Sequence, residues 1–165
     1  MKRLLLIRHA KSSWDEEGLT DFERPLNKRG KRDAPFMASL LKKEKIKPDL
    51  IISSPAVRAL STAEKFAEEF EYPPDKIILE KSIYLSGIKE LESIVQSIPD
   101  KNSTVFIFGH NPALTNYANH LGSKIIDNIP TCGIVGLEFK GKNWREVERG
   151  SGNTFLFEFP KKYFK

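Results

Sequence analysis

The chain has 165 residues, of which 39% are hydrophobic and 30% are charged. This length suits one folded domain, residues 1–165, and the composition excludes a disordered or fibrous protein. The net charge is +5, but the lysines and arginines are spread along the whole length. That distribution argues against a nucleic-acid partner and agrees with an anionic substrate.

The sequence also bears on where the protein is found. Its single cysteine, Cys132, excludes an internal disulfide framework. The four apolar residues after Met-Lys-Arg are too few for a signal peptide, and no apolar run reaches the roughly 18 residues of a membrane span. We therefore predict a cytoplasmic protein with no membrane contact. Cys132 lacks a glycine-rich loop ending in arginine, so we predict a buried structural residue, not a nucleophile.

The first half of the chain alternates strand and helix patterns. Leu4–Ile7 is an apolar run typical of a strand buried on both faces. A helical pattern runs from Asn27, a suitable N-cap, to Lys43. Pro35 lies inside it and predicts either a kink or a helix that properly begins near Asp33. A strand at 50–52 and a helix at 56–70 follow.

The second half continues the alternation and then changes character. The patterns predict a strand at 77–79, a helix at 88–98, a strand at 104–108 and a helix at 113–121. After Gly133, turns rich in glycine and asparagine separate predicted strands at 134–139, 144–148 and 155–159. We therefore expect a three-layer α/β/α sandwich with a mostly parallel central sheet and an antiparallel edge at the C-terminal end.

Unusual polar residues follow the three most apolar strands. Arg8-His9 follows the first, Ser53-Ser54-Pro55 with Arg58 follows the second, and Gly109-His110-Asn111 follows the third. Taken alone, the Arg-His pair is more typical of a surface contact than of a catalytic site, and the histidine after Gly109 is equally typical of a turn. Because ligands bind at the carboxyl ends of strands in open α/β sheets, we expect two histidines and two arginines to meet in one crevice.

These motifs together resemble the histidine phosphatase superfamily, and in particular its SixA-type phosphohistidine phosphatases. The resemblance covers about three quarters of the chain in order and spacing, whereas the C-terminal strands agree only in style. It implies a phosphoglycerate mutase-like fold and a phosphatase activity. It is carried by Arg8-His9-Ala10-Lys11-Ser12, Arg24-Pro25-Leu26, Arg29-Gly30, Ser53-Ser54-Pro55-Ala56-Val57-Arg58-Ala59, Thr62-Ala63 and Gly109-His110-Asn111-Pro112.

The resemblance implies a role for each site residue. His9 is the nucleophile that accepts the phosphoryl group, and nearby arginines are expected to lower its pKa. Arg8 and Arg58 grip phosphate oxygens, and His110 donates to them. Arg24 and Ser12 are candidate substrate contacts, and Asn111 either donates to substrate or shapes its turn. No cofactor is expected, and no cluster with metal-ligand spacing occurs in the sequence.

The general acid has no clear candidate. Many relatives place a glutamate after the short strand that follows the second helix, where this chain has Leu85. Glu80, the candidate acid, and the alternatives Asp15, Asp21 and Glu23 also fit solvated surface charges. The lack of a well-placed general acid favours phosphohistidine on a partner protein as the substrate. The alternative functions are a phosphatase of small phosphorylated metabolites and a non-catalytic phosphate-binding module. For the oligomeric state, we expect a monomer.

Overall fold

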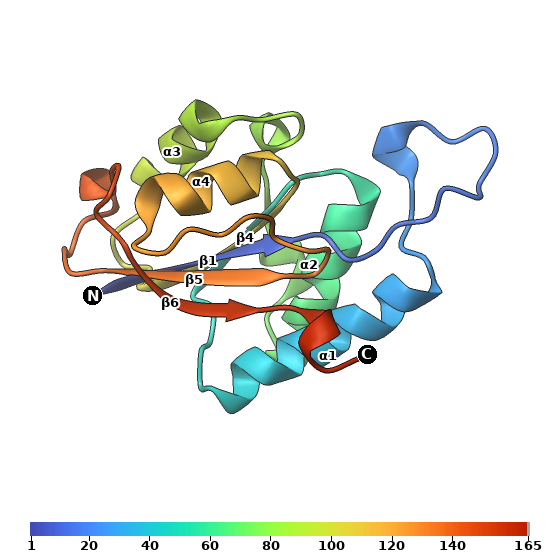
Figure 1. Cartoon of the computed structure of the whole chain (residues 1–165), viewed down its shortest axis with the longest axis horizontal. Coiled ribbons are helices and arrows are strands. Elements are labelled where there is room, and N and C mark those ends of the chain that lie inside the picture. Colours follow the sequence, from blue (N-terminus) through green and yellow to red (C-terminus); the bar gives the residue numbers. More distant parts are fainter. Residues whose placement is uncertain (165) are drawn as a thin grey trace.

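A single mixed β-sheet forms the centre of the molecule. The computed structural model describes residues 1–164. The sheet has six strands in the order β3-β2-β4-β1-β5-β6 (Figure 1). The first four run parallel, β5 runs antiparallel to β1, and β6 runs antiparallel to β5. The strands are β1 (Lys2–Arg8), β2 (Leu50–Ser53), β3 (Ile78–Leu79), β4 (Thr104–Gly109), β5 (Ile134–Phe139) and β6 (Asn153–Glu158).

Helices cover both faces of the sheet and make the predicted three layers. One pair packs on one face and the other pair on the opposite face (Figure 1). Each face therefore has its own hydrophobic core, and the predicted α/β/α sandwich with a C-terminal antiparallel edge is confirmed. The helices are α1 (Lys28–Lys43) and α2 (Val57–Glu69) on one face, and α3 (Ile88–Gln96) and α4 (Ala113–Leu121) on the other.

Strand β1 is buried on both faces, as its continuous apolar run predicts. Leu4 and Leu6 pack into the core beneath α3 and α4, whereas Leu5 and Ile7 pack into the core beneath α1 and α2. This alternation follows from the two-residue period of a strand. Because β1 lies between β4 and β5, the residue that follows it emerges near the middle of the sheet.

Helix α1 begins at Lys28, not near Asp33, and contains Pro35. The Asn27 side chain accepts the Gly30 N–H at 2.9 Å, and the helix runs from Lys28 without interruption through Pro35. Proline removes the bond to the carbonyl four residues earlier, that of Lys31. Lys31 and Pro35 are both exposed, so water can hydrate the Lys31 carbonyl. The start near Asp33 was therefore a wrong alternative.

The C-terminal region contains two strands rather than the predicted three. Trp144–Glu146 forms a short 3₁₀ helix instead of part of a strand. The Trp144 backbone N–H donates to the Asp100 carboxylate at 2.8 Å, and its indole N–H donates to the Asn102 carbonyl at 2.7 Å. These bonds hold the segment in a 3₁₀ turn, and the indole is buried in the core beneath α3 and α4, where it packs against Phe139.

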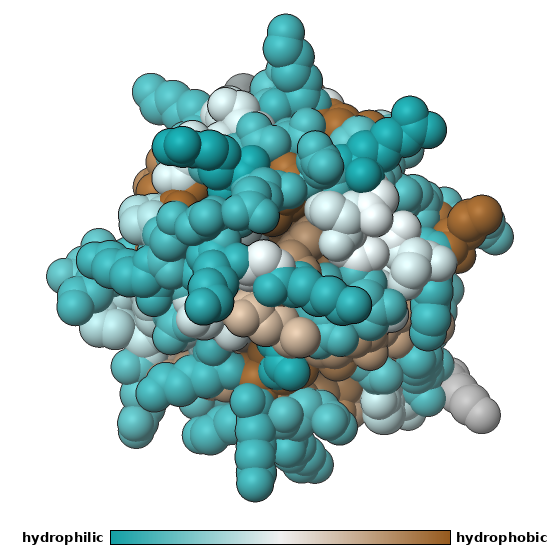
Figure 2. Space-filling model, turned by 90° about the vertical axis from the view of Figure 1, so that its left-hand side faces the viewer, coloured by the Kyte–Doolittle hydropathy of each residue, from teal (hydrophilic) through white to brown (hydrophobic). Residues whose placement is uncertain are grey.

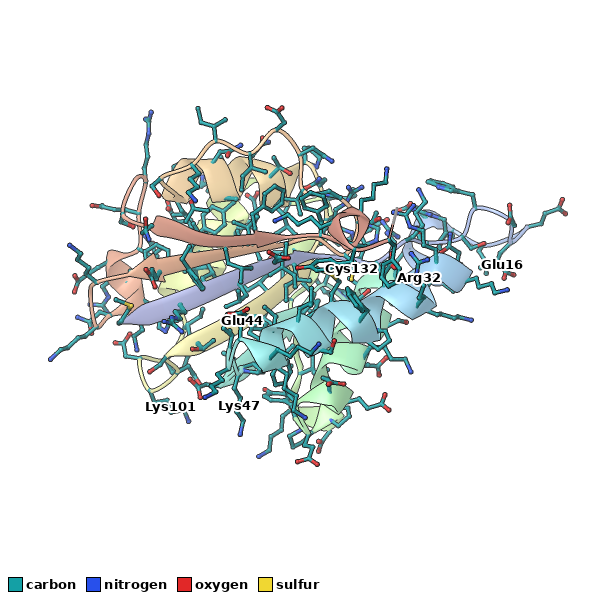
Figure 3. All side chains as sticks on the ribbon, turned by 60° about the horizontal axis from the view of Figure 1, so that its bottom comes forward. Glu16, Arg32, Glu44, Lys47, Lys101 and Cys132 are labelled. Carbon is teal, nitrogen blue, oxygen red and sulfur yellow. The ribbon has the colours of Figure 1, made fainter. Side chains whose placement is uncertain are left out.

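The two ends of the sheet differ in character. At the carboxyl ends of the parallel strands, the segment between β1 and α1 projects from the body of the molecule (Figure 1). Glu16 lies at the tip of this segment, far from Lys101 at the other end (Figure 3). The face at that other end is largely hydrophilic (Figure 2). Within residues 1–164, no helix combines the length and apolar character needed to cross a membrane.

Candidate functional site

His9 lies at the end of β1 with its ring almost completely enclosed, and 8% of the residue is exposed. Its Nδ1 lies 2.7 Å from the Ala10 carbonyl oxygen. A carbonyl can only accept a hydrogen bond, so Nδ1 carries the proton and Nε2 keeps a free lone pair. The pKa of His9 is lowered to about 3, chiefly by burial and, against the Ala10 hydrogen bond, also by His110, Arg58 and Arg8. The predicted direction is therefore confirmed, but burial and not the arginines is the largest cause.

The backbone around His9 is fixed by its neighbours. The His9 N–H donates to the Gly109 carbonyl at 3.1 Å, and the His9 carbonyl accepts the Cys132 N–H at 2.9 Å. The Ala10 N–H donates to the Thr62 hydroxyl at 3.0 Å. The Cys132 side chain is fully buried, as predicted, and burial raises its thiol pKa. His9 is thus held rigidly, and Cys132 contributes backbone rather than a thiolate.

His110 follows β4 and lies beside His9, with ring centroids 5.3 Å apart. Its Nε2 lies 2.8 Å from the Ser54 hydroxyl oxygen, which also accepts the Ala56 N–H. While it accepts the Ala56 N–H, the Ser54 hydroxyl still has its own proton to donate to Nε2. Burial, followed by Arg58, lowers the pKa of His110 to about 4, so the ring is neutral. With the Ser54 hydroxyl donating to Nε2, the ring proton lies on Nδ1.

Arg8 and Arg58 surround the two histidines. Arg8 Nη1 donates to the Ile129 carbonyl at 2.9 Å, and burial followed by Arg58 lowers the Arg8 pKa. Within residues 1–164, three buried nitrogens of this group have no hydrogen-bond partner: Arg8 Nε, Arg58 Nε and His110 Nδ1. Leaving buried donors unpaired is costly, so three of them beside one histidine mark a place built for an anion.

Arg24 and Ser12 join the group from the projecting segment. Arg24 Nη1 donates to the Ser12 hydroxyl at 2.6 Å, and the guanidinium stacks over Trp14 at 3.5 Å from the ring centroid. Asp21 links Arg24 to Arg58, with nitrogen to carboxylate oxygen distances of 3.0 Å to each. Ser12 thus orients Arg24 at the edge of the site.

Asn111 lies near the site with both ends of its side-chain amide engaged. Its Nδ2 donates to the Ile129 carbonyl at 2.9 Å and to Asn128 at 3.0 Å. Its Oδ1 accepts both the N–H and the hydroxyl of Thr115 in the first turn of α4. Of the two predicted roles, these contacts favour the one that shapes the turn.

Glu80 is not brought to the site. Its side chain lines a groove between the end of the sheet and α3, shared with Lys89 and Ile94. Within residues 1–164, its side chain makes no hydrogen bond or ion pair with the site residues. Leu85, at the expected position of the acid, points into solvent with 87% exposure.

Asp21 is the carboxylate that the structure does bring to the site. Its Oδ2 accepts the Tyr84 hydroxyl at 2.6 Å and Arg58 Nη2 at 3.0 Å. The Tyr84 hydrogen bond, with Arg58 and Arg24, lowers the pKa of Asp21 to about 2. Asp21 is therefore ionised and accepts hydrogen bonds. Sequence reasoning named Asp21 only as an alternative acid and missed Tyr84, and the three-residue spacing to Arg24 was the available signal.

The fold and the site together define a class of protein. Two neutral histidines, the half-buried Arg8, the buried Arg58 and unpaired N–H donors meet where the parallel strands end. Such a set can hold a tetrahedral oxyanion against an unprotonated imidazole nitrogen. The molecule is an α/β protein with a candidate site for a phosphate-type anion.

Comparisons with known proteins identify the family. A model of the histidine phosphatase superfamily (branch 1) matches residues 4–80. An uncharacterized chloroplastic protein of Arabidopsis thaliana is 33% identical over 160 residues, which are 92% of this chain and 72% of that protein. The chain belongs to the histidine phosphatase superfamily.

Solved structures agree with this membership. A protein described as a phosphohistidine phosphatase SixA, from Agrobacterium tumefaciens, is 25% identical with a TM-score of 0.79, and the match covers 96% of this chain and 98% of that one. The protein histidine phosphatase SixA complexed with tungstate is 18% identical with a TM-score of 0.83, covering 97% and 98%. The second likeness is one of fold. The predicted SixA-type architecture is confirmed.

Proposed function

We propose that this protein is a phosphatase in which His9 accepts the phosphoryl group, and that its substrate is phosphohistidine on a partner protein. The observation that carries the proposal is the neutral His9, with its Nε2 lone pair free, beside three buried and unpaired N–H donors. The donors suit phosphate oxygens, and the lone pair suits phosphorus.

The reaction follows from these positions. Arg8, Arg58 and the His110 Nδ1–H hold the phosphoryl oxygens, on which negative charge gathers in the transition state. His9 Nε2 attacks phosphorus in line with the departing atom, and its Nδ1–H stays bonded to the Ala10 carbonyl. Water then attacks phosphorus, the bond from phosphorus to His9 Nε2 breaks, and inorganic phosphate leaves the free ring. Arginines supply the positive charge, so we propose that no metal ion takes part.

The choice of phosphohistidine rests on the leaving-group side of the site. The carboxylate present there, Asp21, is ionised and has no proton to give. An alcohol leaves poorly without a proton, whereas an imidazole protonated on its other nitrogen leaves as a neutral molecule. The A. tumefaciens protein, which matches this chain along nearly its whole length, is described as a phosphohistidine phosphatase.

Two further aspects belong to this proposal. All six strands form one sheet between Lys2 and Glu158, which supports one domain over residues 1–165. We also propose a monomer located in the cytoplasm, consistent with a single cysteine that is fully buried.

The test compares three substrates with the wild-type protein and the His9→Ala variant. The substrates are a protein carrying phosphohistidine, a sugar phosphate and p-nitrophenyl phosphate. We expect the phosphohistidine protein to be dephosphorylated fastest and the variant to be inactive on all three. Preference for the sugar phosphate would instead indicate a metabolite phosphatase, and binding without turnover would indicate a phosphate-binding module.

A further inference from the structure

Aromatic rings and one carboxylate frame the opening of the site. Phe22 and Tyr84 pack edge to face with ring centroids 5.2 Å apart, and the Tyr84 ring lies 5.5 Å from that of His110. The Asp21 carboxylate accepts the Tyr84 hydroxyl. We call Asp21, Phe22 and Tyr84 the rim. The rim residues are partly or largely exposed whereas His9 is buried, so the rim lies nearer to solvent than the nucleophile.

The rim lies where a leaving group must be. In phosphoryl transfer the entering and leaving atoms stand on opposite sides of phosphorus. His9 attacks from the buried side, so the leaving group points outward to the opening. Tyr84 contacts His110 on one side and Asp21 on the other, which connects the floor of the site to the rim.

The rim attracts positive charge, in contrast to the floor. Its carboxylate is ionised and pairs with Arg24 and Arg58 on the protein side. The faces of the Phe22 and Tyr84 rings attract cations. The floor, with Arg8, Arg58 and the two histidines, attracts an anion. A substrate that suits both regions carries negative charge on its phosphate and positive charge on its leaving group.

A phosphohistidine with a protonated ring has this distribution of charge. We infer that the rim selects the phosphoimidazolium form of the substrate, with Asp21 as the specificity-determining residue; this rests on the proposed function. The His9 Nε2 lone pair forms the new bond to phosphorus, and the bond from phosphorus to the substrate nitrogen breaks. Its electron pair stays on that nitrogen, so a neutral imidazole departs with its proton on the other nitrogen. The enzyme donates no proton.

A phosphate ester has no positive charge on its leaving group, and that group does not depart as a neutral molecule without a proton. Its leaving oxygen becomes negative in the transition state, and the Asp21 carboxylate repels that charge and cannot protonate it. The rim therefore favours the phosphoramidate and disfavours the ester. Removing the charge of Asp21 is expected to change the ratio of the two activities rather than lower both equally.

The test measures kcat/KM on 3-phosphohistidine and on p-nitrophenyl phosphate for the wild type and Asp21→Asn. We expect the ratio of kcat/KM on 3-phosphohistidine to kcat/KM on p-nitrophenyl phosphate to fall about tenfold. The reason is that the substrate imidazolium then faces a neutral amide instead of a carboxylate. Asp15→Asn is the matched control, because within residues 1–164 the Asp15 carboxylate makes no hydrogen bond or ion pair. It is expected to keep the wild-type ratio.

The outcomes separate the inference from the proposal on which it rests. An equal loss on both substrates in Asp21→Asn, or an equal fall of the ratio in Asp15→Asn, would overturn the role of the rim and leave the phosphatase intact. A wild type inactive on 3-phosphohistidine and on a phosphohistidine protein would overturn the proposed function itself. If Asp21→Asn does not fold, Phe22→Leu keeps the Asp21 contacts, and the same ratio is expected to fall severalfold. An unchanged ratio there would contradict the inference.

Discussion

Arg58 connects the anion site to its rim. Its two terminal nitrogens bind the Asp21 carbonyl and carboxylate, and its buried Nε has no partner within residues 1–164. Tyr84 shares the same carboxylate. A planar guanidinium can donate to Asp21 and to an anion at the same time, whereas the single ammonium of a lysine cannot.

The first prediction concerns this residue. Arg58→Ala is expected to lower kcat/KM for p-nitrophenyl phosphate about a hundredfold, or about 3 kcal/mol, because a transition-state donor is lost. Arg58→Lys retains the charge without the fork and is expected to recover little of the loss. A lysine variant with wild-type kcat/KM would show that charge alone is required.

The second prediction concerns pH and stability. Both site histidines have folded pKa values below 6.5, so the unfolded chain binds more protons as the pH falls. Their contribution to stability is present above about pH 6.5 and is lost toward pH 4, at up to about 1.4 kcal/mol per pH unit for each histidine. Urea unfolding at pH 7, 6 and 5 is expected to show that the free energy of unfolding of His9→Gln falls less steeply with falling pH than that of the wild type. Equal slopes would place His9 in a solvated environment.

The site residues that directly follow strands could be predicted from the sequence. Arg8, His9 and His110 were predicted to meet because parallel strands end at one edge. The Asp21 to Tyr84 bond joins two loops 63 residues apart, and no periodic pattern links them. The Ser54 contact with His110 likewise depends on how β2 and β4 lie side by side.

Helix α1 packs closely against the segment that follows β1. A Cβ built on Gly30 would lie 2.2 Å from the Lys11 carbonyl oxygen, so only glycine allows this approach. That contact keeps Ser12 and the Arg24 that it orients beside α1. The family motif Arg29-Gly30 therefore has a packing reason.

The third prediction follows from this contact. Gly30→Ala is expected to lower the free energy of unfolding by about 1 to 3 kcal/mol, although alanine favours helix elsewhere. Lys31→Ala, on the exposed side of the same turn, is the control and is expected to change stability little. Urea unfolding measures both, and a Gly30→Ala variant as stable as the wild type would contradict the close packing.

Elements with strong periodicity were predicted well and irregular ones were not. The helix at 113–121 agrees with α4 at both ends. The strand predicted at 144–148 is absent because Trp144 binds Asp100 and Asn102, which lie far away in the sequence. Such tertiary contacts override local strand propensity.

At the scale of the whole molecule, we expect stability to depend on anion binding, because the proposed site brings together β1, β2, β4 and the projecting segment. A ligand that binds only the folded state stabilises it by about 2.7 kcal/mol at a hundred times its dissociation constant. The three-layer class was predictable from alternating elements, whereas the strand order β3-β2-β4-β1-β5-β6 was not, since local patterns do not specify neighbours.

The fourth prediction uses this coupling. Phosphate or tungstate is expected to raise the Tm of the wild type, and Arg8→Ala is expected to reduce the rise strongly, since Arg8 contributes an unpaired buried nitrogen. EDTA is expected to change neither Tm nor turnover. A rise of equal size in Arg8→Ala would locate the anion elsewhere.

The central claim is that His9 carries the phosphoryl group. The most direct measurement is rapid quenching of the protein with a ³²P-labelled phosphohistidine protein, followed by acid and base treatment of the trapped enzyme and peptide mapping. We predict a label that is lost in acid, survives base and maps to His9, with none in His9→Ala. A label that persists in His9→Ala, or turnover with no labelled enzyme, would contradict the account.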